Sequence, residues 1–174
     1  KQQYLSIKTE IDETIQIILN NSSFVMGKEV KIFEENFAKI QNAKYCVGVS
    51  NGTSAIHLAL KVLNLKESDE VIVPANSFIA TSEAVTQANL KIKFVDVDEK
   101  THLIDLKKLE QAINNKTKVI IPVHLYGQMC DMEKIQEIAK KHNLFVIEDA
   151  AQAHLAKFKN KHVGFHSDMA CFSF

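Results

Sequence analysis

Residues 119–149 read VIIPVHLYGQMCDMEKIQEIAKKHNLFVIED. Two short apolar runs, at 119–123 and 144–147, flank a stretch at 132–142 in which apolar and charged residues recur at helical spacing. Short apolar runs predict buried strands, and the stretch between them predicts an amphipathic helix. A strand, a helix and a second strand in this order are typical of a βαβ unit, in which the two strands are parallel.

The same alternation extends through most of the chain. It predicts further strands at 45–49, 71–73, 92–95 and 169–174, and further helices at 53–63, 78–88 and 106–113. The expected fold class is therefore α/β, with a mostly parallel sheet. Apolar residues at helical spacing also predict two opening helices, interrupted at 20–27, so that residues 1–40 form a helical arm and residues 41–174 the main domain.

The composition fits one globular domain. The chain has 174 residues, of which 46% are hydrophobic and 24% are charged. The formal net charge is zero and all 21 basic residues are Lys, so we expect no nucleic-acid partner and no Arg clamp for phosphate. The three cysteines, Cys46, Cys130 and Cys171, lie far apart, which predicts reduced thiols and no metal site. The apolar runs are too short to span a bilayer and the N-terminus is polar, so the expected location is the cytoplasm.

Polar residues cluster where the predicted strands end. In parallel sheets the ligand crevice lies beyond the carboxyl ends of the strands. The groups that fall there are SNGTS (50–54), PANSF (74–78), Asp96 with Asp98, HLYGQ (124–128) and EDAAQ (148–152). We interpret this convergence as the main functional signal, although Asp96 and Asp98 are better explained as turn or cap residues.

Two of these groups have a chemical interpretation of their own. Gly52 permits a tight backbone at the start of a predicted helix, where N–H groups can bind a phosphate, but taken alone the segment is better explained as a helix cap. Asp149 ends a predicted buried strand, and a buried carboxylate needs a partner. A protonated pyridine nitrogen is one such partner, and a cap for the next segment is an equal alternative.

Five motifs in register resemble the DegT-type (DegT/DnrJ/StrS) sugar-nucleotide aminotransferases. They are SNGTSAIHLAL (50–60), DEVIVPANSF (69–78), PVHLYGQ (122–128), EDAAQAH (148–154) and ACFSF (170–174). Enzymes of this family depend on pyridoxal 5′-phosphate (PLP), adopt the aspartate-aminotransferase fold (fold type I) and transfer an amino group, usually from glutamate, to a nucleotide-linked keto sugar. The resemblance implies that this chain contains the PLP-binding large domain.

The resemblance also implies a role for individual residues. The phosphate of PLP would be bound by Gly52, Thr53, Ser54 and Ser173, and the ring by Phe78 on one face, Ala151 on the other, Asp149 at its nitrogen and Gln152 at its 3′-oxygen. Each of three residues has an ordinary alternative: Phe78 packs in the core, Ser173 is a plain strand hydroxyl, and Gln152 is a surface amide.

The expected substrate contacts are fewer. Lys28 follows a glycine in a family segment near the substrate or the partner subunit, where it would meet a nucleotide phosphate; the alternative is that Gly27 only ends a helix. His124 and Tyr126 would shape the sugar pocket, and a core histidine with a backbone partner is an equal alternative for His124.

Two departures from the family pattern stand out. The lysine that binds the cofactor should stand five residues after Ser173, whereas the sequence ends at Phe174, so we expect no catalytic residue within these 174 residues. The chain then corresponds to roughly the N-terminal half of a family member, without the smaller C-terminal domain. Leu155 stands where many relatives carry Gly, a change expected to alter the turn without touching the ring contacts.

The function implied by the resemblance is amino transfer to a nucleotide-linked keto-deoxysugar. A dTDP-3-keto-6-deoxyhexose is the favoured substrate, a 4-keto sugar remains open, and the full protein is expected to be a homodimer. One alternative is a PLP-dependent sugar dehydratase with His in place of the lysine. Another is a non-catalytic fragment or binding module.

Overall fold

The computed structural model describes residues 1–174, which divide into two compact units. The first unit comprises Lys1–Lys39 and Lys44–Gly48, and the second comprises Ile40–Ala43 and Val49–Phe174. The first unit is built on helix α1 (Gln2–Asn21) and most of helix α2 (Lys28–Gln41). The two opening helices and the break between them agree with the prediction from the sequence. No residue of α1 is buried.

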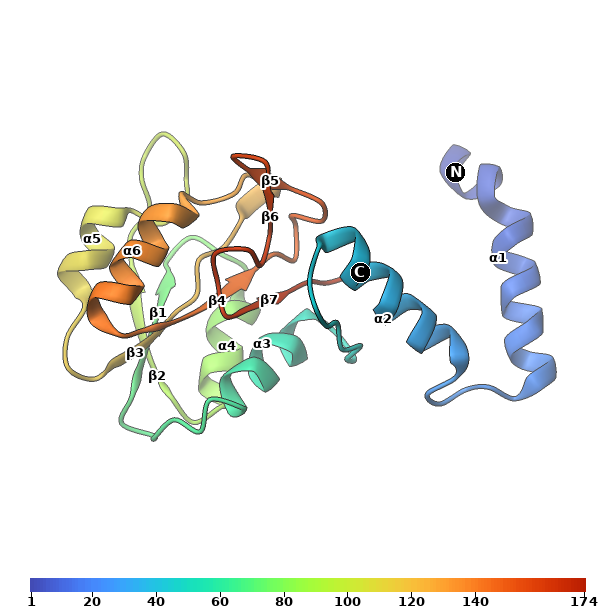
Figure 1. Cartoon of the computed structure of the whole chain (residues 1–174), viewed down its shortest axis with the longest axis horizontal. Helices are drawn as coiled ribbons and strands as arrows, with labels where there is room; N and C mark the ends of the chain where they lie inside the picture. Colours follow the sequence, from blue (N-terminus) through green and yellow to red (C-terminus); the bar gives the residue numbers. More distant parts are fainter. The chain divides into compact units, whose positions relative to one another are not determined.

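The second unit contains a five-stranded sheet in which every pair is parallel. The strands are β1 (Glu70–Pro74), β2 (Lys91–Val95), β3 (Thr117–Ile120), β4 (Phe145–Asp149) and β7 (Met169–Cys171), in the spatial order β2-β1-β3-β4-β7 (Figure 1). The α/β class and the parallel sheet predicted from the alternating apolar runs are confirmed.

One predicted strand does not form. Residues 45–49 have strand-like composition, but no strand is assigned to them. A strand needs a neighbour that pairs its N–H and C=O groups, and no strand of the sheet pairs with this segment. The N–H of Gly48 donates instead to Oε1 of Glu34, at 2.6 Å.

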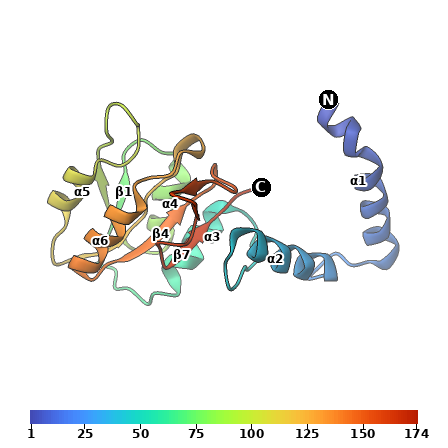
Figure 2. The same cartoon turned by 45° about the horizontal axis from the view of Figure 1, so that its top comes forward.

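Helices cover both faces of the sheet. Helices α3 (Gly52–Lys61) and α4 (Ile79–Gln87) bury residues such as Leu60 and Val85 against Val71 and Ile147. Helices α5 (Leu106–Ala112) and α6 (Met132–His142) cover a second core on the opposite face, in which helix residues such as Leu109 and Ile135 pack with strand residues such as Ile72. Figure 2 shows α5 beside α6, away from α3. This three-layer order follows from the central strands, in which consecutive apolar residues such as Val71 and Ile72 are buried on opposite faces of the sheet.

The remaining elements lie in the connections. A single 3-10 turn, η1 (Leu125–Gly127), follows β3, and a small antiparallel hairpin of β5 (Lys157–Phe158) and β6 (Lys161–His162) lies between β4 and β7. The lysines of this hairpin, Lys157, Lys159 and Lys161, are exposed. Among the helices, none is both long enough and apolar enough to pass through a membrane.

Candidate functional site

The first turn of α3 leaves two backbone donors available. Asn51 is the N-cap, and its side chain accepts the N–H of Ser54 at 2.8 Å. The hydroxyl of Ser50 donates to that of Ser54 at 2.9 Å. The N–H groups of Gly52 and Thr53 have no acceptor within the helix, because the first turn of a helix has no preceding carbonyls. Asn51 is therefore a helix cap, as the alternative reading of this segment states. The N–H groups of Gly52 and Thr53 remain available to a ligand at the start of the helix.

Ser173 lies directly against this turn. A Cβ atom added to Gly52 would stand 2.9 Å from Cβ of Ser173 and 3.3 Å from its Oγ. Only glycine permits the two segments to approach this closely without a shift of one of them. The structure thus brings together Gly52 and Ser173, which are 121 positions apart in the sequence (173 minus 52), as the family resemblance implies.

Asp149 ends β4 with its side chain buried, at 6% exposure. Its Oδ2 accepts a hydrogen bond from Oγ1 of Thr81 at 2.6 Å, and its Oδ1 accepts the N–H of Ala151 at 3.2 Å. In the sheet Asp149 pairs with Cys171, two residues before Ser173. The carboxylate is therefore held at the same edge of the sheet as the start of α3.

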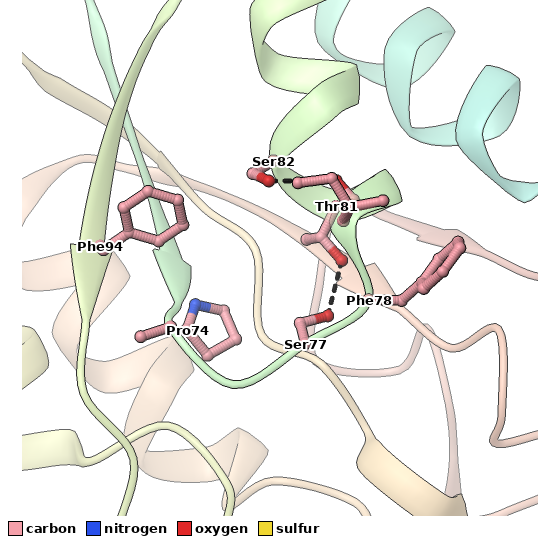
Figure 3. A pocket seen from close by; sticks show the side chains of 8 residues that line it. Pro74, Ser77, Phe78, Thr81, Ser82 and Phe94 are labelled. Atoms are coloured by element: carbon pink, nitrogen blue, oxygen red, sulfur yellow. Dashed lines mark hydrogen bonds between the residues drawn. The ribbon is translucent and has the colours of Figure 1, made fainter.

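Thr81 is a site residue that the sequence analysis missed. It lies in the first turn of α4, and its Oγ1 also contacts Oγ of Ser77 at 2.8 Å (Figure 3). The signal that points to it is its spacing, because a hydroxyl three residues after Phe78 falls on the same turn as that ring. The turn from Ser77 to Thr81 therefore joins α4 to the carboxylate of β4.

Phe78 precedes α4 and is 75% exposed. The alternative that it packs in the core is wrong. In Figure 3 its ring extends away from the Ser77 and Thr81 hydroxyls. Beside this turn lies a cavity of about 180 Å³, lined by Pro74, Ala75, Ser77, Phe78, Ile79, Thr81, Ser82 and Phe94. Asp149 does not line this cavity and is linked to the turn of Phe78 through the hydroxyl of Thr81. An exposed aromatic ring on this turn is a suitable platform for a flat cationic heterocycle.

Gln152 and Tyr126 are joined across the end of β4. Oε1 of Gln152 accepts the backbone N–H of Tyr126 at 2.7 Å, which leaves the Nε2 group of Gln152 as a donor. Tyr126 has φ 56°, in the left-handed region, and its side chain is 85% exposed. Gln152 is exposed, as its surface-amide alternative states, but its orientation is set by this contact.

His124 is a buried core residue and does not line an open pocket. Its Nδ1 accepts the N–H of Cys130 at 3.2 Å, so its proton is on Nε2, which contacts Oε2 of Glu148 at 2.5 Å. Glu148 is also fully buried, and its Oε1 accepts from the N–H of Gly164 and the hydroxyl of Ser167. The core alternative for His124 is therefore correct, with a carboxylate as a second partner, because a ring that is bonded on both sides in the interior cannot reach a ligand.

Lys28 belongs to the first unit, whereas the other candidate residues belong to the second. Its side chain is 73% exposed and lies 4.0 Å from a carboxylate oxygen of Glu29. The contact expected between Lys28 and a nucleotide phosphate stays a prediction.

Asp96 and Asp98 are turn residues, as expected. A hydrogen bond from Lys108 is the main cause that lowers the pKa of Asp96, and backbone N–H groups of Thr101 and Lys100 lower that of Asp98. No group of three His, Cys, Asp or Glu side chains is placed to hold a metal ion.

Two of the three cysteines are core residues with neutral thiols. Burial raises the pKa of Cys130 to about 12. Burial, together with the charge of Asp149, also raises the pKa of Cys171 to about 12. Neither thiol is therefore a nucleophile near neutral pH.

The donor set fits PLP. The start of α3 offers N–H groups and hydroxyls of Thr53, Ser54 and Ser173 to an anion, in a chain without Arg. Asp149 offers a buried, oriented carboxylate to a ring nitrogen. The close approach of Gly52 and Ser173 leaves no room for a side chain at this point.

Sequence comparison places the chain among sugar-nucleotide aminotransferases. The profile of the DegT/DnrJ/EryC1/StrS aminotransferase family matches residues 5–174. A "Pleiotropic regulatory protein" of Geobacillus stearothermophilus is 46% identical over 173 residues, which are 99% of this chain and 46% of that protein. A dTDP-3-amino-3,6-dideoxy-alpha-D-galactopyranose transaminase of Aneurinibacillus thermoaerophilus is 44% identical over 100% of this chain and 48% of its own length. A GDP-perosamine synthase of Escherichia coli O157:H7 is 48% identical over 85% of this chain and 41% of its own length.

Solved structures with the same fold carry the cofactor or an intermediate. Streptomyces venezuelae DesV in complex with a ketimine intermediate superposes with a TM-score of 0.96 at 36% identity, over 100% of this chain and 47% of DesV. The PMP-form of the putative sugar aminotransferase Spr1654 from Streptococcus pneumoniae has a TM-score of 0.90 at 30% identity, over 96% and 46%. E. coli GDP-4-keto-6-deoxy-D-mannose-3-dehydratase with bound hydrated PLP has a TM-score of 0.82 at 37% identity, over 87% and 41%.

The parallel sheet, the helices on both of its faces and the groups at its carboxyl edge define the large domain of a fold type I aminotransferase. The chain belongs to the DegT/DnrJ/EryC1/StrS aminotransferase family. It spans about half the length of the curated relatives it matches.

Proposed function

We propose that this chain binds PLP for amino transfer from an amino acid, glutamate being the expected donor, to a nucleotide-linked keto-deoxysugar. The single observation that carries the proposal is the buried carboxylate of Asp149, held by Thr81 from the turn that presents the exposed ring of Phe78. Burying a carboxylate is costly unless it is paired, and the hydrogen bonds of Asp149 come from a hydroxyl and a backbone N–H, not from a cation. A protonated ring nitrogen would supply the cationic partner.

Each residue has a defined task. Gly52 and Thr53 donate backbone N–H groups to the phosphate, and Ser54 and Ser173 donate hydroxyls. Asp149 accepts a hydrogen bond from the protonated ring nitrogen. When bound, PLP supplies an electron sink for the carbon that exchanges its amino group.

The ring is held on its remaining sides. Phe78 stacks on one face, Ala151 packs against the other, and Nε2 of Gln152 donates to the 3′-oxygen, since its Oε1 is occupied by Tyr126. The lysine of the family pattern would follow Ser173 by five positions, outside these residues.

The favoured substrate is a dTDP-linked 3-keto-6-deoxyhexose. The name of the Aneurinibacillus relative, a dTDP-3-amino sugar transaminase, supports this choice. Another relative is named for a GDP sugar, so the nucleotide itself varies within the family. We assign Tyr126, with its exposed side chain, and Lys28 to the substrate side of the site. His124 is no longer assigned there, because it is buried.

A structural likeness supports sugar dehydration as the second candidate reaction. The structure of a PLP-containing GDP-sugar dehydratase has the same fold at 37% identity. The dehydratase alternative needs His where the aminotransferases have the lysine, so the residue five positions after Ser173 in the source gene discriminates between them. We further propose a cytoplasmic homodimer for the whole protein, with residues 1–40 as a helical arm.

Titration with pyridoxamine 5′-phosphate tests the cofactor site. This form is an amine, so it cannot form adducts with the 21 lysines as an aldehyde would. We expect saturable binding, measured by quenching of cofactor fluorescence, and a decrease in affinity of at least about tenfold in Asp149→Asn, which loses a hydrogen bond between charged groups. The matched control is Asp96→Asn, an exposed surface carboxylate. Equal affinity of the Asp149→Asn variant and the wild type would contradict the proposal.

A further inference from the structure

Two hydroxyls stand in line behind the carboxylate of Asp149. Oγ1 of Thr81 donates to Oδ2 of Asp149 at 2.6 Å, and Oγ of Ser77 lies 2.8 Å from Oγ1 of Thr81. A hydroxyl has one proton to donate, and that of Thr81 is directed to the carboxylate. Ser77 is therefore the donor to Thr81, and the line runs from Ser77 through Thr81 to Asp149.

This line fixes the plane of the carboxylate. The terminal torsion of an aspartate is broad, so one donor alone leaves the group free to turn. In Asp149 each oxygen has its own donor, Thr81 on Oδ2 and the N–H of Ala151 on Oδ1. Thr81 is 1% exposed, so water does not replace it.

Both oxygens of Asp149 are held as hydrogen-bond acceptors, Oδ2 by Thr81 and Oδ1 by the N–H of Ala151. A hydrogen bond donated to a carboxylate stabilises its charged form. Opposite a pyridine nitrogen, this decides whether a shared proton resides on the ring or on the acid. Of the other titratable groups around Asp149, Cys171 on β7 holds a neutral thiol, with its pKa raised to about 12, and Glu148 is engaged with His124.

We propose that Thr81, supported by Ser77, is a positioning residue that orients Asp149 and keeps the proton on the ring nitrogen of the bound cofactor. The inference rests on the proposed function. The inference gives the turn from Phe78 to Thr81 two roles. Phe78 would contact the face of the cofactor ring, and Thr81 would orient the carboxylate that faces the ring nitrogen.

The test compares Thr81→Val, which keeps the shape but removes the hydroxyl, with Thr81→Ser, which keeps the hydroxyl. The probe is pyridoxamine 5′-phosphate labelled with ¹⁵N in the ring, observed by NMR, together with its affinity. We expect about tenfold weaker binding in Thr81→Val and a ¹⁵N shift toward the unprotonated form. Thr81→Ser should remain within about threefold of wild type. Thr86→Val is the control on the same helix, since its hydroxyl bonds only to a helix carbonyl.

Three outcomes would overturn the inference: wild-type affinity in Thr81→Val, an unmoved ¹⁵N signal, or a Thr81→Ser variant as weak as Thr81→Val. If Thr81→Val does not fold, Ser77→Ala decides, with a smaller change of the same sign expected and no change counting against the proposal. Absence of binding by the wild type overturns the proposed function and this inference together, whereas binding with no effect of the variants overturns only the inference.

Discussion

At the scale of single residues, the fold restricts which residue type is tolerated at positions 52 and 155. Gly52 needs the absence of a side chain, because Cβ of Ser173 lies only 2.9 Å from the position that a Cβ atom would take. Leu155 adopts φ 61°, a left-handed conformation that favours glycine, at the position where the family pattern has Gly. Glycine at position 52 suits the close approach of Ser173, whereas leucine at position 155 is strained by its left-handed backbone.

Substitution of Gly52 by Ala should weaken binding of pyridoxamine 5′-phosphate. The added Cβ would meet Ser173 at 2.9 Å and force the start of α3 away from the end of the chain. Such overpacking costs about 1–3 kcal/mol. Fluorescence titration measures the affinity and urea denaturation measures the stability. Gly48→Ala is the control, because there the nearest atom, at 3.3 Å, belongs to the flexible side chain of Glu34. Unchanged affinity in Gly52→Ala would argue against a phosphate at this turn.

Substitution of Leu155 by Gly should raise the free energy of unfolding by about 0.5–1 kcal/mol. The left-handed conformation costs a leucine about 1–2 kcal/mol, and the added entropy of the unfolded glycine offsets part of the gain. Leu155 is 53% exposed, so little packing is lost. Leu155→Ala removes the same side chain but keeps the backbone penalty, and it should give no gain. Urea denaturation of the two variants decides, and equal stability would show that the backbone here is unstrained.

At the scale of elements, the buried pair of His124 and Glu148 ties two connections, that between β3 and α6 and that between β6 and β7, to the end of β4. Glu148 reaches the loop before β7 through Gly164 and Ser167, and His124 holds the chain at Cys130. Because Glu148 and Asp149 are consecutive, they point to opposite faces of the strand. One acid supports the loops while the next faces the proposed cofactor.

Substitution of His124 by Leu should therefore destabilise the fold by about 1–3 kcal/mol, since the buried Oε2 of Glu148 would lose its hydrogen-bond donor. The free energy of unfolding in urea measures this loss. His57→Leu is the control, because His57 is only half-buried on α3. A loss below about 1 kcal/mol would mean that the carboxylate takes up a proton or finds another donor.

At the scale of the whole molecule, the two units differ in how their helices are stabilised. The α/β unit encloses two cores on either side of its sheet. Helix α1 has twenty residues, none of them buried, and apolar residues such as Leu5 and Ile15 are more than half exposed. Most of the stability of a helix in a protein comes from packing of its apolar face, and α1 has no buried residue.

Hydrogen exchange should accordingly be fastest in α1 and slowest in β1 and β3. Protection of a backbone amide follows the free energy of local opening, which is small where no apolar contact is lost. Mass spectrometry of the exchanged chain at low micromolar concentration measures this. Repetition at higher concentration is the control for self-association. Slow exchange in α1 at every concentration would contradict the absence of buried contacts.

The sequence by itself determined the order of strands and helices, the parallel sheet, and the place of Asp149 at the end of a buried strand, because alternating apolar runs and polar strand ends are local patterns. It also placed a strand at 45–49 that does not form, since composition does not show whether a partner strand is present. Only the tertiary structure decided that His124 is buried, that Phe78 is exposed, and that Thr81 supports Asp149 from 68 positions away. These outcomes depend on contacts between distant segments, and such contacts are set by packing rather than by any local pattern.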